Sequence, residues 1–353
     1  MAQKHTTIDN ATIAELLCRE AEKTKPPLQR ALRRAGRAAL LWPEEAAEVV
    51  RQNRTLREFP AIGPYLEKII LKWIDDPPLA LGPIPEIRRN FLTLTEARAI
   101  LAENPQWRSL VRGDLQMHTE WSDGSANVRD MAQSAVQLGH SYISITDHAK
   151  GLKIAGGINE AELSEQAREI EAVNDEFNQG EKPLRILHSI ELNLNPQGEG
   201  DMDLAALNKL DIVLGAFHSA LRKKEDQTER YLAALRNPAL HILGHPRGRI
   251  FNFRLGLYAD WPRVFGLAAE LDRAVEIDCY PDRQDLDVSL LKVARAAGVR
   301  ISLGTDAHHP WQLRFVEFGL AAAKLARIPQ DRILNFMSSE QLLSWADNVR
   351  EYA

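Results

Sequence analysis

Histidine, aspartate and glutamate residues recur in this sequence where apolar segments give way to polar loops. Imidazole and carboxylate groups are common protein ligands of divalent metal ions, so their convergence at one place would form a metal centre. Their number exceeds what one ion with open positions needs and suits two or three ions, with a carboxylate such as Glu191 as a bridge. The residues that stand out are Gln116, His118, Asp123, His148, Glu191, His218, His245, Asp306 and His308.

A centre of several ions would favour the hydrolysis of a phosphoester, because such ions bind phosphate oxygens and lower the pKa of bound water. Within "GDLQMHTEWSDGS" (113–125), a His-x-His pair would be natural, but Gln116 occupies the first position. A glutamine carbonyl is a neutral, weak donor that suits Mn²⁺ or Mg²⁺ better than Zn²⁺. The sequence therefore predicts a metal site that is altered at residue 116.

Seven apolar, β-rich segments position these residues, and amphipathic helical segments separate them. Continuous apolar strands that alternate with helices indicate a parallel sheet covered on both faces. Seven such units in succession favour a closed β/α barrel, in which the chemistry lies at the carboxyl ends of the strands. The predicted strands lie within residues 111–118, 142–148, 184–193, 210–219, 239–248, 274–282 and 299–309.

The first 110 residues have helical periodicity instead. Within "LREFPAIGPYLEKIILKWI" (56–74), a helix end meets a tight turn, and the backbone N–H groups and positive end of the next helix can hold a phosphate. The segment resembles a helix-hairpin-helix, a module that binds the DNA backbone, with Ala61 in place of the first hairpin glycine. A plain helical hairpin is the alternative. The resemblance implies DNA contacts by Ile62, Gly63, Tyr65, Lys68 and Lys72.

Composition sets limits on the class of protein. The 353 residues suggest two domains, and the two cysteines are too few for a disulfide framework. No uncharged apolar run approaches the roughly 20 residues of a membrane span, and the N-terminus lacks the apolar core of a signal peptide, so we expect a cytoplasmic protein. Of the net charge of −5, residues 1–110 hold +3 (17 basic, 14 acidic), which leaves −8 for the rest. An acidic body suits cations, and a basic head suits a polyanion.

Residues 111–353 resemble the polymerase-and-histidinol-phosphatase (PHP) family, and in particular the C-terminal PHP domain of bacterial family X DNA polymerases. The similarity includes "ITDHAKGLKIAGGINE", "FHSALRKKEDQTERYLAALRNP", "ILGHPRGRI", "PDRQDLD" and "GTDAHHP". Residues 8–74 resemble the N-terminal helical domain of those polymerases. The polymerase palm is missing, because about forty residues separate the two parts and hold no paired-Asp strand, so we do not expect polymerase activity.

The resemblance implies a distorted seven-stranded, TIM-like barrel with a trinuclear metal site at the nine positions named above. It implies that His148, Asp123 and His245 share one ion and that Glu191 lies between two others. The ions would be Mn²⁺, Zn²⁺ or Fe, with Mn²⁺ favoured for activity. Residues that match the family pattern and would contact substrate phosphate are Arg222, Arg249, Arg283 and Lys150.

We therefore predict a helical domain with the helix-hairpin-helix in residues 1–75, a helical linker in 76–110 and a PHP barrel in 111–353. The predicted function is metal-dependent hydrolysis at DNA ends, as a 3′→5′ exonuclease or 3′-phosphatase in repair, with sequence-independent DNA binding. Two alternatives remain at this point: a small-molecule phosphatase of the histidinol-phosphate type, and a non-catalytic DNA-binding protein.

Overall fold

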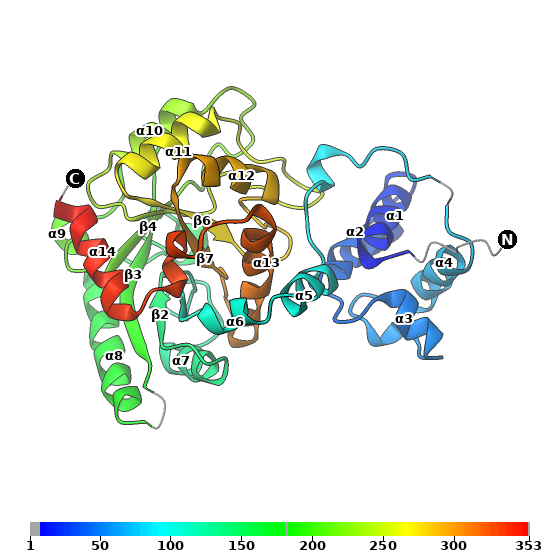
Figure 1. The fold of residues 1–353 in the computed structure, drawn as a ribbon, viewed down its shortest axis with the longest axis horizontal. Helices are drawn as coiled ribbons and strands as arrows, with labels where there is room; N and C mark the ends of the chain where they lie inside the picture. Colours follow the sequence, from blue (N-terminus) through cyan, green and yellow to red (C-terminus); the bar gives the residue numbers. More distant parts are fainter. Residues whose placement is uncertain (1–7, 79, 181–182, 352–353) are drawn as a thin grey trace.

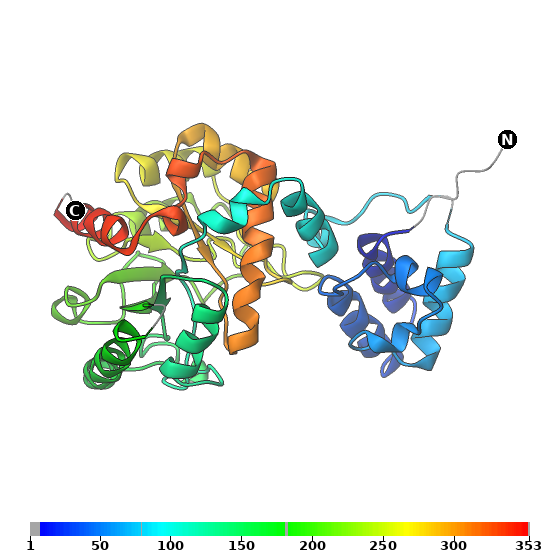
Figure 2. The ribbon, with the colours of Figure 1, turned by 60° about the horizontal axis from the view of Figure 1, so that its bottom comes forward.

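The computed structural model describes residues 8–78, 80–180 and 183–351, so residues 1–7 of the predicted helical domain lie outside the described residues. Along the chain, a small helical head (residues 8–75) precedes a larger β/α barrel (Figures 1 and 2). The α-helices of the head are α1 (Asn10–Glu22), α2 (Leu28–Ala39), α3 (Ala46–Arg51) and α4 (Pro64–Asp75).

The head has an apolar core of its own. Helix α1 begins at an Asp9 cap, whose carboxylate accepts the N–H of Thr12, and its apolar face packs against α2. Trp42 is fully buried and stacks on Phe59 with 4.7 Å between ring centroids. A short 3₁₀ turn (Leu56–Glu58) and a tight loop lead into α4, and Ala61 in that loop has a left-handed φ of 66°.

The barrel is a seven-stranded sheet in the order β1 to β7, and every pair of neighbours is parallel. Each strand lies within one of the seven predicted segments, and the predicted TIM-like barrel is confirmed. No strand precedes Gly113 in the part of the chain that the structure describes. The strands are β1 (Gly113–Asp114), β2 (Tyr142–Ile145), β3 (Arg185–Asn193), β4 (Ile212–Ala216), β5 (Ile242–Leu243), β6 (Ala274–Asp278) and β7 (Arg300–Gly304).

The ring closes just beyond the ends of β7 and β1. Met117 and Ala307 form a parallel bridge there, and the N–H of His118 donates to the carbonyl of Ala307 at 2.8 Å. The N–H of Asp306 donates to the carbonyl of Gln116 at 3.0 Å. The seam of the barrel therefore passes through predicted metal ligands and fixes their backbone.

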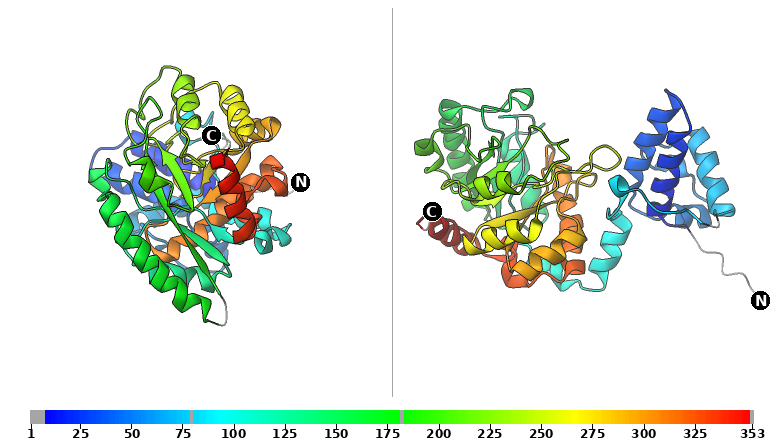
Figure 3. Two further views of the ribbon diagram at one scale, coloured as in Figure 1. Left: turned by 90° about the vertical axis from the view of Figure 1, so that its left-hand side faces the viewer. Right: turned by 90° about the horizontal axis from the view of Figure 1, so that it is seen from above.

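Helices surround the sheet, as Figure 3 shows from two sides. Within the predicted linker, α5 (Leu94–Ala102) packs against α13, and Leu101 and Trp107 are buried in the barrel core, so these helices pack with the barrel. The remaining helices are α6 (Gln106–Leu110), α7 (Val128–Gln137), α8 (Glu160–Asn178), α9 (Leu204–Leu207), α10 (Thr228–Leu235), α11 (Trp261–Glu270), α12 (Val288–Ala297), α13 (Val316–Ala326) and α14 (Ser339–Glu351). None of the described helices combines the length and the apolar character that crossing a bilayer requires.

A buried ion pair joins the head to the linker and the barrel. Arg88 donates to both carboxylate oxygens of Glu15, at 2.7 and 3.0 Å, and the side chains of both residues are at most 4% exposed. The same guanidinium reaches Asn252, in the loop between β5 and α11, at 3.0 Å. Phe251 of that loop packs in the apolar core of the head. The described head and barrel are therefore in direct contact through buried side chains.

Candidate metal centre

Glu191, at the carboxyl end of β3, is the centre of a cluster of imidazoles. One carboxylate oxygen, Oε1, lies 2.7 Å from Nε2 of His245 and 3.0 Å from Nε2 of His218. The other, Oε2, lies 3.1 Å from Nδ1 of His148 and 3.4 Å from Nε2 of His118. Burial opposes ionisation of Glu191, but His148, His218 and His245 outweigh it and hold the pKa of the carboxyl well below its usual value.

The remaining predicted ligands extend this cluster on the side of β7 and β1. His118 Nε2 lies 3.0 Å from Oδ1 of Asp306, and Asp123 Oδ1 lies 3.2 Å from Nε2 of His308 and 3.5 Å from Nε2 of His148. In three groups, the possible ligand atoms all lie within 4.8 Å of one another. The groups are His118, Asp123, His148 and His308; His148, Glu191 and His218; and His118, Glu191 and Asp306.

This donor set fits divalent ions. Nδ1 of His148 and Oε2 of Glu191, which lie 3.1 Å apart, are buried and form no hydrogen bond of normal geometry with any described residue. Buried polar atoms are normally satisfied, so two such atoms side by side in one cluster indicate a ligand. Asp306 also has a left-handed φ of 51°, an uncommon conformation for a residue with a side chain, and such strain is often found at functional sites.

One predicted grouping needs correction. His245 was expected to share an ion with Asp123 and His148, but it lies against Glu191 beside His218. His118 and His308 accompany His148 around Asp123 instead. The reason is the position along the barrel: His245 follows β5, whereas His308 follows β7 and meets the β1 loop where the ring closes.

Gln116, just after β1, is fully buried and faces an acid on strand β6. In the orientation that satisfies both side chains, its amide nitrogen lies 2.7 and 3.0 Å from the two carboxylate oxygens of Glu276. Glu276 also accepts the backbone N–H of His245 at 2.7 Å. Burial, reinforced by the nearby carboxylate of Asp278, raises the pKa of Glu276 well above its usual value. Gln116 therefore has a structural partner that the sequence alone did not reveal.

Two buried acids that were not predicted from the sequence, Asp147 and Asp285, hold the loops that carry the ligands. Asp147, beside His148, accepts the N–H and hydroxyl of Thr119 at 2.8 and 2.6 Å, which fixes the loop between His118 and Asp123. Asp285 accepts the N–H groups of Arg247 and Gly248, just after His245. For Glu276, the sequence did hold a signal. Glu276 and Asp278 are two residues apart on β6, so their side chains lie on the same face of the sheet, which in this barrel is the interior.

The four predicted phosphate-contacting residues lie in different surroundings. Arg283 is at the centre itself, with Nη1 2.6 Å from Oδ2 of Asp306 and 3.6 Å from Oδ2 of Asp278. Lys150 pairs with Glu160 at 2.6 Å, away from the cluster. Arg222 is exposed, and its guanidinium carbon lies 4.6 Å from the centroid of the Phe253 ring.

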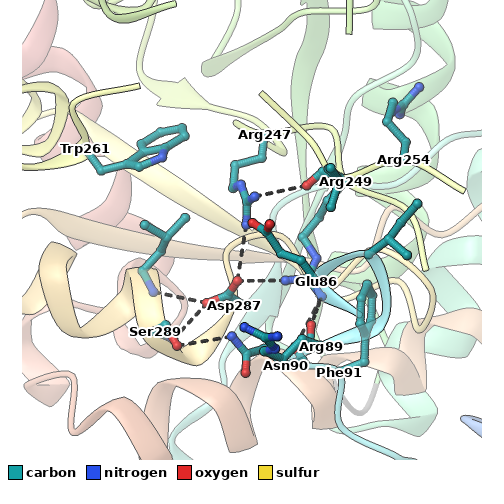
Figure 4. Close-up of a pocket in the computed structure, with 13 residues that line it drawn as sticks. Glu86, Arg89, Asn90, Phe91, Arg247, Arg249, Arg254, Trp261, Asp287 and Ser289 are labelled. Atoms are coloured by element: carbon teal, nitrogen blue, oxygen red, sulfur yellow. Dashed lines mark hydrogen bonds and ion pairs between the residues drawn. The ribbon is translucent and has the colours of Figure 1, made fainter. Parts of the chain in front are cut away.

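Arg249 lies in a separate cavity of about 260 Å³ between linker and barrel, which Figure 4 shows. It is 4% exposed, donates to Asp287 at 2.8 Å and to the carbonyl of Arg89 at 3.1 Å, and stacks over Phe91. None of the eight clustered ligands lines this cavity. Through these contacts, Arg249 holds the linker against the barrel.

Of the residues predicted to contact DNA, those on α4 are exposed, whereas Ile62 is buried. Tyr65, Lys68 and Lys72 lie on the exposed side of α4, and Gly63 precedes that helix. Ile62 is only 8% exposed and packs in the core of the head, and its N–H donates to the carbonyl of Phe59 at 3.3 Å. Its side chain and amide are thus both used within the hairpin.

Comparison with known proteins identifies a domain and several relatives to which this chain is similar. Residues 114–280 match the PHP domain model. The chain is 35% identical over 229 residues to "DNA polymerase/3'-5' exonuclease PolX" of Bacillus subtilis (strain 168), which covers 65% of this chain, and the match spans 40% of the length of that relative. It is 28% identical over 233 residues to a probable phosphatase of Thermoanaerobacter sp. (strain X514), covering 63% of this chain and 89% of that protein.

Among solved structures, the histidinol phosphate phosphatase of Lactococcus lactis, complexed with zinc, L-histidinol and phosphate, aligns with a TM-score of 0.44 and 19% identity. The alignment covers 62% of this chain and 95% of that one. The residues that match the PHP domain span the strands from β1 to β6, so the barrel of this chain carries a PHP-type domain.

Proposed function

We propose that this protein is a metal-dependent phosphoesterase that acts on DNA ends, as a 3′→5′ exonuclease or 3′-phosphatase. The observation that carries the proposal is the convergence of eight imidazoles and carboxylates, in which the buried Nδ1 of His148 and Oε2 of Glu191 form no hydrogen bond with the described part of the chain. Bound divalent ions would supply a water of lowered pKa and charge stabilisation for the phosphoryl oxygens.

The residues of this chain divide the work around that centre. Glu191 belongs to two of the three ligand groups and has two carboxylate oxygens, so it could serve neighbouring ions, whereas His118 and His148, which also belong to two groups, would each hold one ion. Arg283 lies against Asp306 and its side chain is 34% exposed, so its guanidinium can also hold a substrate phosphate oxygen. The buried carboxylates of Glu276 and Asp147 keep the strand ends and loops in position.

The head supports DNA as the substrate. Tyr65, Lys68 and Lys72 form an exposed, basic face on α4, next to the hairpin loop that leads into the positive end of that helix. Contacts of this kind bind phosphates without reading sequence. The relative named as a polymerase and 3′-5′ exonuclease also favours DNA, although the chain spans only 40% of it.

A small-molecule phosphatase is the second candidate, because relatives named as probable phosphatases match along 89% of their length. One comparison separates the two: initial rates with Mn²⁺ on single-stranded, nicked and 3′-phosphorylated DNA, beside histidinol phosphate. We expect DNA to be the better substrate by kcat/KM. Turnover of histidinol phosphate without measurable turnover of any DNA would reject the proposal in favour of the second candidate.

A further inference from the structure

A small hairpin in the loop between β5 and α11 lies between the metal centre and the head. Ile250 and Arg254 form its antiparallel bridge, and the N–H of Ile250 donates to the carbonyl of Arg254 at 2.9 Å. The hairpin begins five residues after the predicted ligand His245. Figure 3 shows this loop reaching from the barrel toward the head.

The tip of the hairpin is anchored to the head and the linker. Phe251 is 4% exposed in the core of the head and meets the Phe91 ring edge-on at 5.1 Å. Asn252 accepts a hydrogen bond from Arg88 at 3.0 Å. These contacts hold the backbone before Phe253, and the bridge at Arg254 holds it after; the side chain of Phe253 nevertheless points outward, and the residue is 52% exposed.

Cationic side chains surround this exposed ring. The guanidinium of Arg222, four residues after the predicted ligand His218, lies 4.6 Å from the ring centroid, and exposed Lys223 follows it. Among the described residues, Arg222 and Arg254 form no ion pair, and Nε of Arg254 donates to the carbonyl of Gly248. Burial, together with the nearby guanidinium groups of Arg283 and Arg222, lowers the pKa of Arg254, and Asp285 opposes this effect. Positive charge is thus gathered beside the ring, and Glu225 and Asp226 end the basic run.

This surface continues to the centre on one side and to the head on the other. Arg283, which acts electrostatically on Arg254, contacts Asp306 at 2.6 Å. On the head, Arg37 of α2 reaches Asp282, the neighbour of Arg283, at 3.2 Å. Helix α2 carries further exposed arginines at positions 30, 33 and 34. A polyanion that contacts the head can therefore follow cationic side chains to the ligand cluster.

An exposed aromatic ring with the guanidinium of Arg222 beside it matches the chemistry that binds single-stranded nucleic acids, in which bases stack on aromatic faces and cations follow the backbone. We propose that Phe253, flanked by Arg222 and Arg254, is a stacking platform for a base of single-stranded DNA near the metal centre. This inference rests on the proposed function and specifies its substrate: an end in which the terminal bases are unpaired. A folded protein partner would not require the accumulated positive charge.

The test compares the affinity of the full-length protein for single-stranded and blunt duplex DNA, both in EDTA so that no turnover occurs. The probe is a single strand of about ten nucleotides that carries 2-aminopurine, whose fluorescence reports stacking. Phe253→Ala should weaken single-strand binding roughly 5- to 150-fold and abolish the fluorescence change, because stacking contributes about that much per base. Duplex binding should stay unchanged, since paired bases cannot reach the ring.

Two further variants make the result specific. Phe253→Trp should restore binding, because it retains an aromatic face. Leu138→Ala is the matched control: Leu138 is 45% exposed and precedes β2 at the opposite end of the barrel, so its loss should change neither measurement. Equal single-strand affinity and equal fluorescence for Phe253→Ala and the unchanged protein would overturn the platform.

Failure of the platform and failure of the proposed function give different results. If the protein hydrolyses DNA ends with Mn²⁺ but Phe253→Ala binds single strands normally, only the platform is overturned. If single strands bind through Phe253 but no DNA is hydrolysed, the platform is supported and the proposed function fails.

Discussion

Replacing Gln116 with leucine tests which role this residue has. Gln116 and Glu276 are both fully buried, and the amide satisfies both carboxylate oxygens. Leucine cannot donate, so Glu276 would keep only the N–H of His245. Because its raised pKa keeps Glu276 largely neutral, leaving its Oε1 unsatisfied costs about 1–3 kcal/mol, losing the second hydrogen bond costs about 1 kcal/mol, and the added apolar burial returns about 1 kcal/mol. We therefore expect the free energy of unfolding to fall by about 1–3 kcal/mol in the metal-free protein.

The assay is urea denaturation in EDTA at neutral pH, with Glu276→Leu as the background for a double-mutant cycle. In that background, Gln116→Leu should destabilise the protein far less, because the carboxylate that needs the amide is gone. The reasoning would be refuted if Gln116→Leu unfolded at the same urea concentration as the unchanged protein. A loss of metal affinity alone would identify Gln116 as a ligand instead of the partner of Glu276.

Three other predictions concern the metal centre and the head. Burial opposes protonation of both histidines, but the Glu191 carboxylate raises the pKa of His245 to about 10, and Asp123 raises the pKa of His308 to about 9. Because both values lie above the ordinary 6.5, the free energy of unfolding of the metal-free protein should fall as the pH rises from about 6.5 through 10. Over the same range, the Mn²⁺ concentration at half-saturation should fall, because the imidazoles lose the protons that compete with the metal. Gln116→His should raise metal affinity roughly 10- to 100-fold, so that the protein holds more metal by elemental analysis and its phosphodiesterase activity depends less on added Mn²⁺. Equal metal content in the two proteins would reject this prediction. Changing Lys68 and Lys72 together to alanine should reduce the slope of log affinity against log salt by about 2 without altering sequence preference, and an unchanged slope would exclude α4 from the DNA interface.

The barrel was predictable because its strands are local, apolar and separated by helices, and the ligands follow them directly. Each of the seven predicted segments holds a strand, and His148 and Glu191 lie at strand ends as expected. The sequence did not show which of the predicted ligands lie next to one another. His245 and His308 are separated by 63 residues, and which of them meets Asp123 depends on the point at which the ring closes.

Other features depended on contacts that leave no local pattern. An acid inside a strand, such as Glu276 of β6, cannot be assigned a partner until the closed barrel brings Gln116, which follows the non-adjacent strand β1, against it. Arg249 follows a predicted ligand closely in sequence, yet the loop turns it toward Asp287 and the linker. Phe251 and Phe253 are alike in sequence, but only the packing of the head shows that one is buried and the other exposed.

The most direct test of the central claim is the release of a 3′-terminal label from single-stranded DNA by the full-length protein, with and without Mn²⁺. Glu191→Gln is the decisive variant, because Glu191 contacts four imidazoles and its loss removes the shared carboxylate charge. The account predicts label release that requires Mn²⁺ and is lost in Glu191→Gln. Release that persists in EDTA, or equal rates for the two proteins, would contradict it.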